Sequence, residues 1–210
     1  MNQPSSSPAL EVDPKGHRDF LNRYYGISRY FYDLTRKYYL FGRDRALRQL
    51  AAEPGWTRLI EIGSGTGRNL RKLRRMRPDA SLGGVEASDA MIEHARTRCP
   101  GMHFVRGFAE EVDYSKLLGA PPQRIIFSYS LSMIQQPVAA LDQARRMVAP
   151  GGDVIVVDFA DLEGLPSSWA AGLRAWLRTF HVNPIEHDFI RQHARKIEYG
   201  PGRYYLIARL

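Results

Sequence analysis

Three glycines at alternate positions carry the strongest chemical signal in the sequence. Gly63, Gly65 and Gly67 follow an apolar run that ends at Ile62, and a helical pattern begins directly after them. Glycines between a strand and a helix let the backbone turn tightly and let its N–H groups approach a ligand closely. The spacing is G-x-G-x-G, so it is neither the dinucleotide motif G-x-G-x-x-G nor a phosphate loop closed by G-K-[ST]. The loop therefore predicts a ligand site that has no pyrophosphate to hold.

Two carboxylates stand on either side of these glycines. Glu61 comes just before the loop, and Glu86 ends the next apolar run, nineteen residues after Gly67. A carboxylate at that strand end can accept both hydrogen bonds of a ribose diol, and Glu61 is placed to face a ligand's ammonium group. A ribose and an amino-acid part without a pyrophosphate describe S-adenosylmethionine. We therefore expect this cofactor, with S-adenosylhomocysteine as its product. We expect no metal, because the six histidines lack a ligand spacing.

The elements that must position these residues alternate from Arg58 onward. Amphipathic helical patterns at 66–76, 88–98 and 138–148 separate short, nearly continuous apolar runs, which are typical of strands buried on both faces of a parallel sheet. This alternation predicts an α/β fold with a Rossmann-like, doubly wound sheet and helices on both faces. The predicted strands are 58–62, 81–87, 103–107, 124–130 and 153–159.

A different pattern follows residue 158. The sequence predicts a helix over 167–180 and then a C-terminal antiparallel hairpin about a Pro-Gly turn. The large apolar residues of the predicted helix share one stripe, which consists of Trp169, Leu173, Trp176, Leu177 and Phe180.

Length and composition favour one domain with an appended segment. The chain has 210 residues, of which 44% are hydrophobic. We expect a flexible tail at 1–15, an N-terminal helical lid at 16–54 and the cofactor-binding domain at 55–210. The apolar runs are too short for a transmembrane helix and the single cysteine fits a reducing compartment, so we expect a cytoplasmic protein. The net charge of +8 implies an anionic partner.

The stretches EIGSGTG, VEAS and APGG together resemble the class I S-adenosylmethionine-dependent methyltransferases, over roughly residues 55–160. This resemblance implies that the three glycines line the methionine part of the cofactor and that Glu86 binds its ribose. It also implies adenine contacts from Ala87, Met91, Ala109 and Glu110. For Glu110, an exposed position at a helix start is an equal interpretation.

A narrower resemblance covers nearly the whole chain after residue 20. The segments YDLTRKYYLFGRDR, SYSLSMI, VVDFADLEGLP and LRAWLRTFHVNP are similar to the bacterial betaine-lipid methyltransferases. Those enzymes trimethylate the amine of diacylglyceryl-homoserine. The resemblance implies an N-methyltransferase whose acceptor is a lipid headgroup, working at an anionic membrane surface on the inner face.

Three other functions stay open. The first is a small-molecule N- or O-methyltransferase of secondary metabolism, which would act on a soluble amine or hydroxyl. The second is a non-catalytic cofactor-binding subunit. The third is an RNA methyltransferase, suggested by the basic run at 71–77. Nucleic acid is the least favoured partner, because no RNA-binding module accompanies the charge.

Aromatic and cationic residues are interleaved at 30–45, in YFYDLTRKYYLFGRDR. A structural helix is one interpretation of this stretch. We favour the wall of an acceptor pocket, because repeated N-methylation gives a quaternary ammonium and aromatic faces bind such cations. The expected acceptor contacts are Tyr25, Tyr30 and Arg43. By resemblance, Tyr32 contacts the cofactor's methionine carboxylate or the path of the methyl group.

Residues for acid–base assistance are few. In-line methyl transfer to a neutral amine depends mainly on position and on exclusion of water. His181 is the candidate general base, with Tyr129 and Tyr32 as hydrogen-bonding alternatives, although a lone histidine after a helix is more often structural. Ser130 is expected at the cofactor's reactive end, and Ser132 is expected to orient the acceptor.

Overall fold

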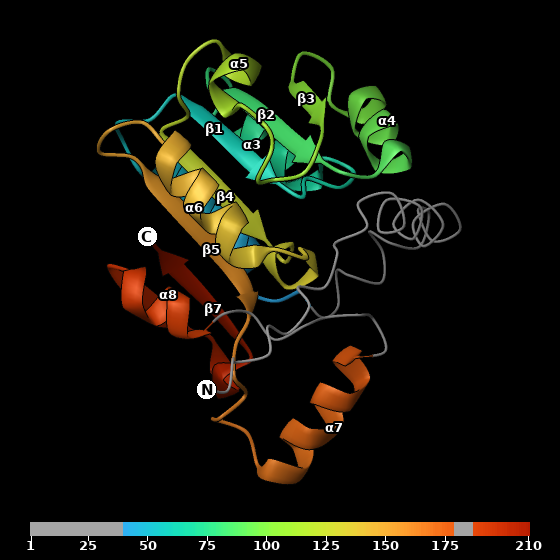
Figure 1. Cartoon of the computed structure of the whole chain (residues 1–210), viewed down its shortest axis with the longest axis vertical. Helices are drawn as coiled ribbons and strands as arrows, with labels where there is room; N and C mark the ends of the chain where they lie inside the picture. The colour runs from blue at the N-terminus through green and yellow to red at the C-terminus, as the bar shows by residue number, and fades with distance from the viewer. Residues whose placement is uncertain (1–39, 179–186) are drawn as a thin grey trace, which may run out of the picture.

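A seven-stranded sheet forms the centre of the computed structural model, which describes residues 40–178 and 187–210 (Figure 1). The strand order is β3-β2-β1-β4-β5-β7-β6. The first five strands in this order are parallel, and β7 runs antiparallel to both β5 and β6. The strands are β1 (Arg58–Ile62), β2 (Ser81–Glu86), β3 (His103–Arg106), β4 (Arg124–Ser128), β5 (Asp153–Phe159), β6 (Lys196–Tyr199) and β7 (Tyr205–Arg209).

The predicted fold class is confirmed, with each predicted strand found within two residues of its expected end. Register brings the ends of the central strands to one edge, because Ile62 lies opposite Val85 on β2 and opposite Phe127 on β4. Strand β1 thus has later strands on both sides, and such a switch point is where ligands bind in open α/β sheets.

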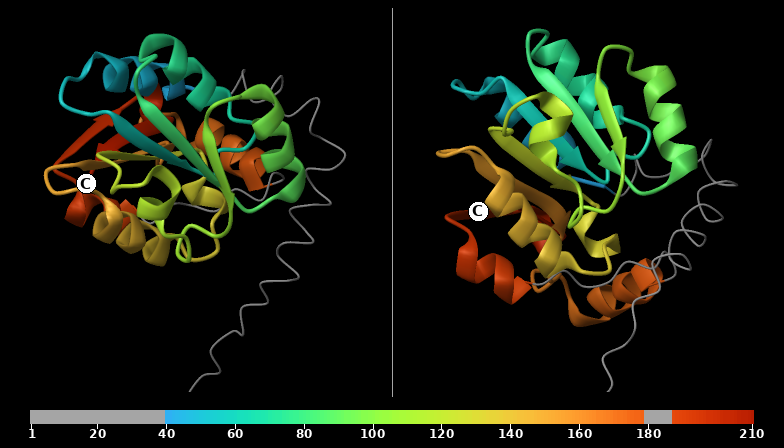
Figure 2. Two further views of the ribbon diagram at one scale, coloured as in Figure 1. Left: turned by 90° about the horizontal axis from the view of Figure 1, so that it is seen from above. Right: turned by 45° about the horizontal axis from the view of Figure 1, so that its top comes forward.

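Helices cover both faces of the sheet (Figure 2). Alternate residues of each central strand belong to different cores: Leu59 packs with one set of helices and Ile60 with the other. The first set is α2 (Arg43–Ala52), α3 (Arg68–Met76) and α4 (Asp89–Arg98). The second set is α5 (Tyr114–Leu118), α6 (Pro137–Met147) and α8 (His187–His193).

The C-terminal hairpin also packs against the start of α2. Two short 3₁₀ turns, η1 (Leu131–Met133) and η2 (Pro201–Arg203), follow β4 and β6. After η2, the Tyr205 ring lies where side chains at Gly42 and Gly200 would have to be, because a Cβ atom on either glycine would come closer than 3.0 Å to the ring. Residues near position 42 and position 205 are therefore fixed to each other.

Helix α7 (Ser167–Arg178) buries less of its predicted apolar stripe than the pattern suggested. Leu177 is buried, but the side chains of Trp169 and Trp176 are 75% and 41% exposed. In Figure 1 the helix lies at one end of the molecule, away from the strands on the β3 side of the sheet. Phe180, the last residue of the stripe, lies outside the described residues. No helix in the ranges 40–178 and 187–210 is long and apolar enough to cross a bilayer.

The glycine before α2 gives a test of this packing. Gly42 and Gly55 both have positive φ, at 78° and 81°, but only Gly42 faces a close neighbour, whereas a Cβ at Gly55 would meet nothing within 4 Å. Gly42→Ala should therefore lower the free energy of unfolding by about 1–3 kcal/mol more than Gly55→Ala, because overpacking adds to backbone strain. Denaturant unfolding measures both. Equal losses would mean that the Tyr205 ring moves aside without cost.

Candidate functional site

The glycine loop lies where the ends of β1, β2 and β4 meet. Gly63, Gly65 and Gly67 have φ values of 68°, 53° and 74°, a region that side chains rarely occupy. The loop is held by Val85, whose carbonyl accepts from the N–H groups of Gly63 and Ser64 at 2.8 and 3.1 Å. The strand-to-helix turn that the sequence predicted is therefore present.

The three glycines differ in what their missing side chains make room for. A Cβ on Gly63 would come closer than 3.0 Å to the Cβ of Ser130, and one on Gly67 would lie 2.7 Å from the sulfur of Cys99. A Cβ on Gly65 would meet nothing within 4 Å. Protein packing thus explains the first and third glycines, and Gly65 alone faces open space in which a ligand can approach its backbone.

The carboxylate of Glu86 joins this loop to the end of β2. Its two oxygens accept from the N–H groups of Gly65, at 2.8 Å, and Ser88, at 2.9 Å, and the residue is buried. A carboxylate has about four lone-pair sites and can accept more than two hydrogen bonds. Binding of the ribose diol by Glu86 stays a prediction.

Glu61 is buried below the loop in a small polar cluster. One of its oxygens accepts from the side-chain amide of Asn69 at 2.6 Å, and that amide also donates to the Ser128 hydroxyl at 3.2 Å. Burial raises the pKa of Glu61 to about 8, against the hydrogen bond from Asn69 and the positive charge of Arg43. The second oxygen, Oε2, is buried with no hydrogen-bond partner. An unsatisfied buried acceptor of this kind fits a cationic ligand group.

Small and apolar side chains lie beyond Glu86. Met91 on α4 and Ala109 are buried, and Ala87 is partly buried. Partial burial raises the pKa of Glu110, and the negative charge of the neighbouring Glu111 acts in the same direction. A hydrogen bond from its own backbone opposes this rise in pKa without cancelling it. Contact of these residues with the adenine stays a prediction.

The loop after β4 shows how its serines are held. The Ser130 hydroxyl donates to the Ile62 carbonyl at 2.7 Å, which ties this loop to the end of β1. The backbone N–H of Ser132 donates to Asp158 at 3.1 Å, and its buried hydroxyl oxygen has no partner. The expected role of Ser132 in orienting the acceptor stays a prediction.

Tyr129 serves a structural purpose in this arrangement. Its φ of 55° is unusual for a residue other than glycine, and its hydroxyl donates to the Phe41 carbonyl at 2.5 Å. Burial, and then the negative charge of Asp158, raise the pKa of Tyr129 well above its usual value. The tyrosine thus holds the segment before α2 against the end of β4, and its catalytic role stays a prediction.

A group of aromatic rings continues from Tyr129 to the surface. Ring centroids are 4.8 Å apart between Tyr129 and Phe159, 5.7 Å between Phe159 and Tyr204, and 5.4 Å between Tyr204 and Phe41. Each pair has an edge-to-face geometry, which is a favourable arrangement for aromatic rings. Phe41, at the outer end, is 54% exposed.

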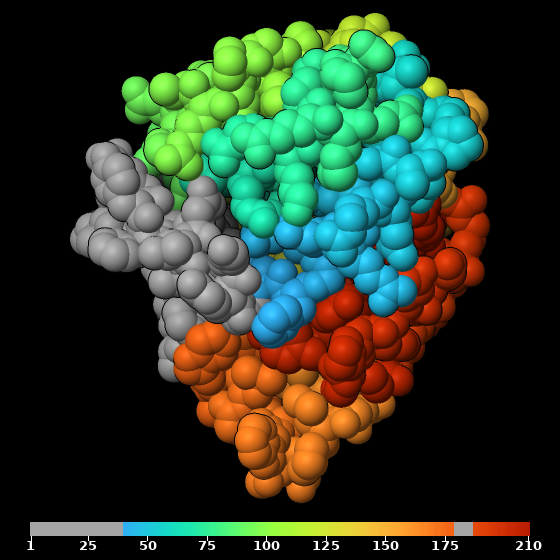
Figure 3. Space-filling view, turned by 180° about the vertical axis from the view of Figure 1, so that it is seen from behind, coloured from blue at the N-terminus to red at the C-terminus, as the bar shows by residue number. Residues whose placement is uncertain are grey.

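This ring group borders a pocket of about 780 Å³, which we call the arginine pocket. Its elements meet on the face of the molecule shown in Figure 3, where α2, α3 and the C-terminal hairpin come together. Among the described residues of the lining, Asp44 is the single acidic one, and it pairs with Arg68 and Lys72. The lining residues are Leu40, Phe41, Gly42, Arg43, Asp44, Arg45, Arg48, Arg68, Leu165, Pro201, Tyr204 and Tyr205.

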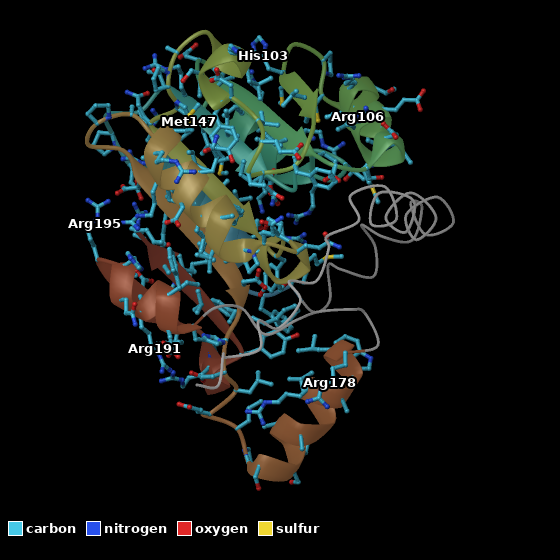
Figure 4. All side chains as sticks on the ribbon, viewed as in Figure 1. His103, Arg106, Met147, Arg178, Arg191 and Arg195 are labelled. Atoms are coloured by element: carbon cyan, nitrogen blue, oxygen red, sulfur yellow. The ribbon has the colours of Figure 1, made fainter. Side chains whose placement is uncertain are left out.

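The structure describes only some of the predicted acceptor and catalytic residues. Arg43 lies in the pocket lining, as expected for an acceptor contact, although its role is a prediction. Tyr25, Tyr30, Tyr32 and His181 lie outside the described residues, and so do the predicted tail and most of the predicted lid. Among the residues at 40–178 and 187–210, no group of three or more His, Cys, Asp or Glu side chains is arranged to hold a metal. His103, for example, lies on β3, at the end of the molecule opposite Arg178 on α7 (Figure 4).

Sequence reasoning missed several residues of this region. Asn69 is an uncharged polar residue beside the buried Leu70 and Leu73 of an otherwise cationic helix, and that contrast was its only signal. No local pattern in the sequence connects Arg48 with Tyr204, because 155 residues lie between them. They meet through the packing of the hairpin on α2.

Residues 30–202 match the model of a protein family described as "Methyltransferase domain". The chain belongs to this methyltransferase family. It is 25% identical over 201 residues to the demethylmenaquinone methyltransferase of Beutenbergia cavernae, covering 90% of this chain and 80% of that one. It is 30% identical over 100 residues to the trans-aconitate 2-methyltransferase of Methylobacterium nodulans, covering 47% and 37%.

Solved structures of methyltransferases share the fold. The sugar N-methyltransferase KedS8 from Streptoalloteichus has a TM-score of 0.53 and 19% identity, covering 77% of this chain and 60% of that one. A possible histamine N-methyltransferase from Thermotoga maritima has a TM-score of 0.62 and 21% identity, covering 88% and 98%. This methyltransferase spans less than two thirds of KedS8 and of the Methylobacterium relative. It is an S-adenosylmethionine-dependent methyltransferase, as the sequence predicted.

The buried carboxyl group of Glu61 should make the stability of this methyltransferase depend on pH. The raised pKa of Glu61 means that this carboxyl group holds its proton more tightly in the folded protein than in the unfolded chain, where its pKa is near 4.5. Stability from this group is complete below that value and is lost as the pH rises towards 8. Glu61→Gln keeps an acceptor for Asn69 and cannot ionise.

Without cofactor, Glu61→Gln should melt at nearly the same temperature as the wild type at pH 4.5 and at a higher temperature at pH 8. Thermal unfolding at several pH values measures this difference. Glu93→Gln, an exposed change on α4, is the control and should show no such trend. A difference that stays constant with pH would contradict the account of Glu61.

Proposed function

We propose that this methyltransferase transfers methyl groups to the amine of an anionic acceptor, the homoserine headgroup of diacylglyceryl-homoserine, to give a betaine lipid. The observation that carries the proposal is the arginine pocket, which is lined by both cationic and aromatic residues. A headgroup that bears both a carboxylate and a methylated ammonium requires both kinds of surface.

The arginines support recognition of the carboxylate. Arg43, Arg45, Arg48 and Arg68 face one acidic residue in the lining. Arg45 pairs with Glu198 and Arg68 with Asp44, whereas Arg48 is exposed and makes no ion pair with any residue that the structure describes. Arginine binds carboxylates through two parallel N–H donors, so Arg48 is the residue best placed to accept a new anionic partner.

The aromatic rings support recognition of the product. Each methyl transfer leaves a more substituted ammonium, and the final quaternary form cannot donate a hydrogen bond. Ring faces attract such cations, by about 0.5–2 kcal/mol each. Phe41 and Tyr204 lie in the pocket lining, and the proposed contacts from Tyr25 and Tyr30 would add to them.

The glycine loop and its carboxylates would hold the cofactor. In this proposal Gly65 faces the methionine part beside Gly63 and Gly67, Glu61 faces its ammonium group, and Glu86 accepts from the ribose. Ala87, Met91, Ala109 and Glu110 then border the adenine. We also propose roles for Ser130 at the reactive end of the cofactor and for Tyr32 in contact with its methionine carboxylate or the path of the methyl group.

Methyl transfer depends more on the alignment of the amine with the methyl group than on acid–base catalysis. S-adenosylmethionine supplies an electrophilic methyl group on a sulfonium. The protein's part is to hold a neutral amine in line and to keep water away, which accounts for most of the acceleration in such transfers. Ser132 is proposed to orient the acceptor, and His181, Tyr32 or Tyr129 to assist loss of the amine proton.

A small-molecule N- or O-methyltransferase is the second candidate. The names of the relatives include acceptors such as trans-aconitate, menaquinone precursors and sugars. The arginine pocket would also suit a small acceptor that carries an anionic group, without an acyl chain.

The test is turnover with diacylglyceryl-homoserine in neutral detergent micelles, followed by mass spectrometry of the lipid. We expect the trimethylated product. Arg48→Gln should raise the KM for this lipid about tenfold and leave kcat nearly unchanged, because a charge-assisted contact to the carboxylate is lost. Arg146→Gln, an exposed change on α6, should leave both values unchanged.

The lipid acceptor would be rejected if the lipid stays unmodified although the enzyme binds S-adenosylhomocysteine in the same buffer. Methylation of a panel of small amines and carboxylated hydroxyl compounds would then favour the second candidate.

A further inference from the structure

Helix α7 presents two tryptophans to solvent. Trp169 is 75% exposed and Trp176 is 41% exposed, and both stand among the four large apolar residues with the most exposure in the described chain. They are seven positions apart, so they lie within about 20° of each other around the helix axis. The two indole rings therefore form one edge of α7, separate from the buried contacts of Ala170 and Leu177.

The rest of the outer surface of α7 is small or cationic. Ala171, Gly172 and Ala175 are exposed beside the tryptophan edge, and Arg174 and Arg178 are exposed on the far side of them. The sequence of the helix, SSWAAGLRAWLR, contains no acidic residue. Tryptophan edges, small residues and arginines together are typical of a helix that lies in the interface of an anionic bilayer.

The loop before α7 is bonded to the C-terminal hairpin and to α8. Asp161 accepts hydrogen bonds from Arg203 of η2 and pairs with Arg191 of α8 at 3.2 Å. Its carbonyl accepts from Arg174 of α7 itself, at 2.7 Å. A Cβ on Gly164 would lie 2.8 Å from the backbone of Gly202, so the two loops are in close contact. The helix is thus held in place by the loop before it, while Trp169 and Trp176 remain 75% and 41% exposed.

The helix also begins beside the arginine pocket. Leu165 lines that pocket and stands two residues before Ser167, the first residue of α7. A bilayer that meets α7 would consequently lie next to the pocket in which an anionic headgroup is proposed to bind.

We propose that α7 is the membrane-docking element of this protein, with Trp169 and Trp176 inserted at the interface of an anionic lipid surface and Arg178 at the level of the headgroups. This inference deepens the proposed function, since it says how an enzyme with a lipid acceptor would reach its substrate. The formal net charge of +8 on the whole chain favours the same surface.

The tryptophans themselves report the contact. The chain has three, and Trp56 is 1% exposed and donates its indole N–H to the Leu50 carbonyl. A change of emission when vesicles are added must therefore come from α7. Phosphatidylglycerol vesicles that contain no homoserine lipid should shift the emission to shorter wavelength, and brominated acyl chains should quench it. Phosphatidylcholine vesicles, or added salt, should weaken both effects.

Variants separate the helix from general surface charge. The double change Trp169→Ala with Trp176→Ala should reduce co-sedimentation with phosphatidylglycerol vesicles about tenfold, because two interfacial side chains are lost. Arg178→Gln should reduce it less, by about threefold to fivefold. Val138→Ala and Arg146→Gln, which remove an exposed apolar and an exposed cationic side chain from α6, should leave it unchanged. Circular dichroism and the melting temperature check that each variant is folded.

Failure of docking and failure of the proposed acceptor are distinguishable. Vesicle binding that the double variant retains would overturn the role of α7, even if the lipid is methylated in micelles. Methylation that fails in an enzyme whose α7 tryptophans insert would reject the acceptor and leave the docking element in place. A concentration-dependent dimer that the double variant abolishes, without any vesicle binding by the wild type, would assign this edge to a second copy of the chain and contradict the proposal.

Discussion

One buried carboxylate fixes the geometry on which the cofactor site depends. Glu86 accepts from the N–H of Gly65 in the loop after β1 and from the N–H of Ser88 after β2, so it fastens two neighbouring strand ends to each other. Charge-assisted bonds to backbone N–H groups are among the stronger hydrogen bonds in proteins. With the loop held in this way, Gly65 keeps the side on which a Cβ would meet nothing within 4 Å open to a ligand.

The loop is also fixed from the opposite side of β1. Ser130 binds the carbonyl of Ile62, while Asn69 connects Glu61 to Ser128. Polar groups from β1, α3 and the end of β4 therefore meet below the glycines. Within this network the second oxygen of Glu61 is the atom without a partner, and a buried polar atom of this kind is often explained by a bound ligand.

Local patterns were sufficient to predict the fold and the strand-to-helix turn after β1, while the roles of the cofactor-site residues stay predictions. The strands could be read from continuous apolar runs, and the glycine spacing with Glu86 placed the switch point, because these signals lie within about 25 neighbouring residues. The arginine pocket could not be predicted in the same way. Arg48, Leu165 and Tyr204 converge only because the antiparallel hairpin inserts β7 beside β5 and carries η2 to the start of α2. Periodicity also failed for α7, since it does not say whether an apolar stripe meets the protein or a partner.

Calorimetric titration with S-adenosylhomocysteine tests the central claim most directly, with Glu86→Ala compared against the wild type and against Glu93→Ala. The account predicts that Glu86→Ala weakens binding by about 1–3 kcal/mol, through loss of the ribose hydrogen bonds and of the bond that orients Gly65, while Glu93→Ala binds as the wild type does. Equal affinity in a folded Glu86→Ala variant would contradict the claim that this carboxylate grips the nucleoside.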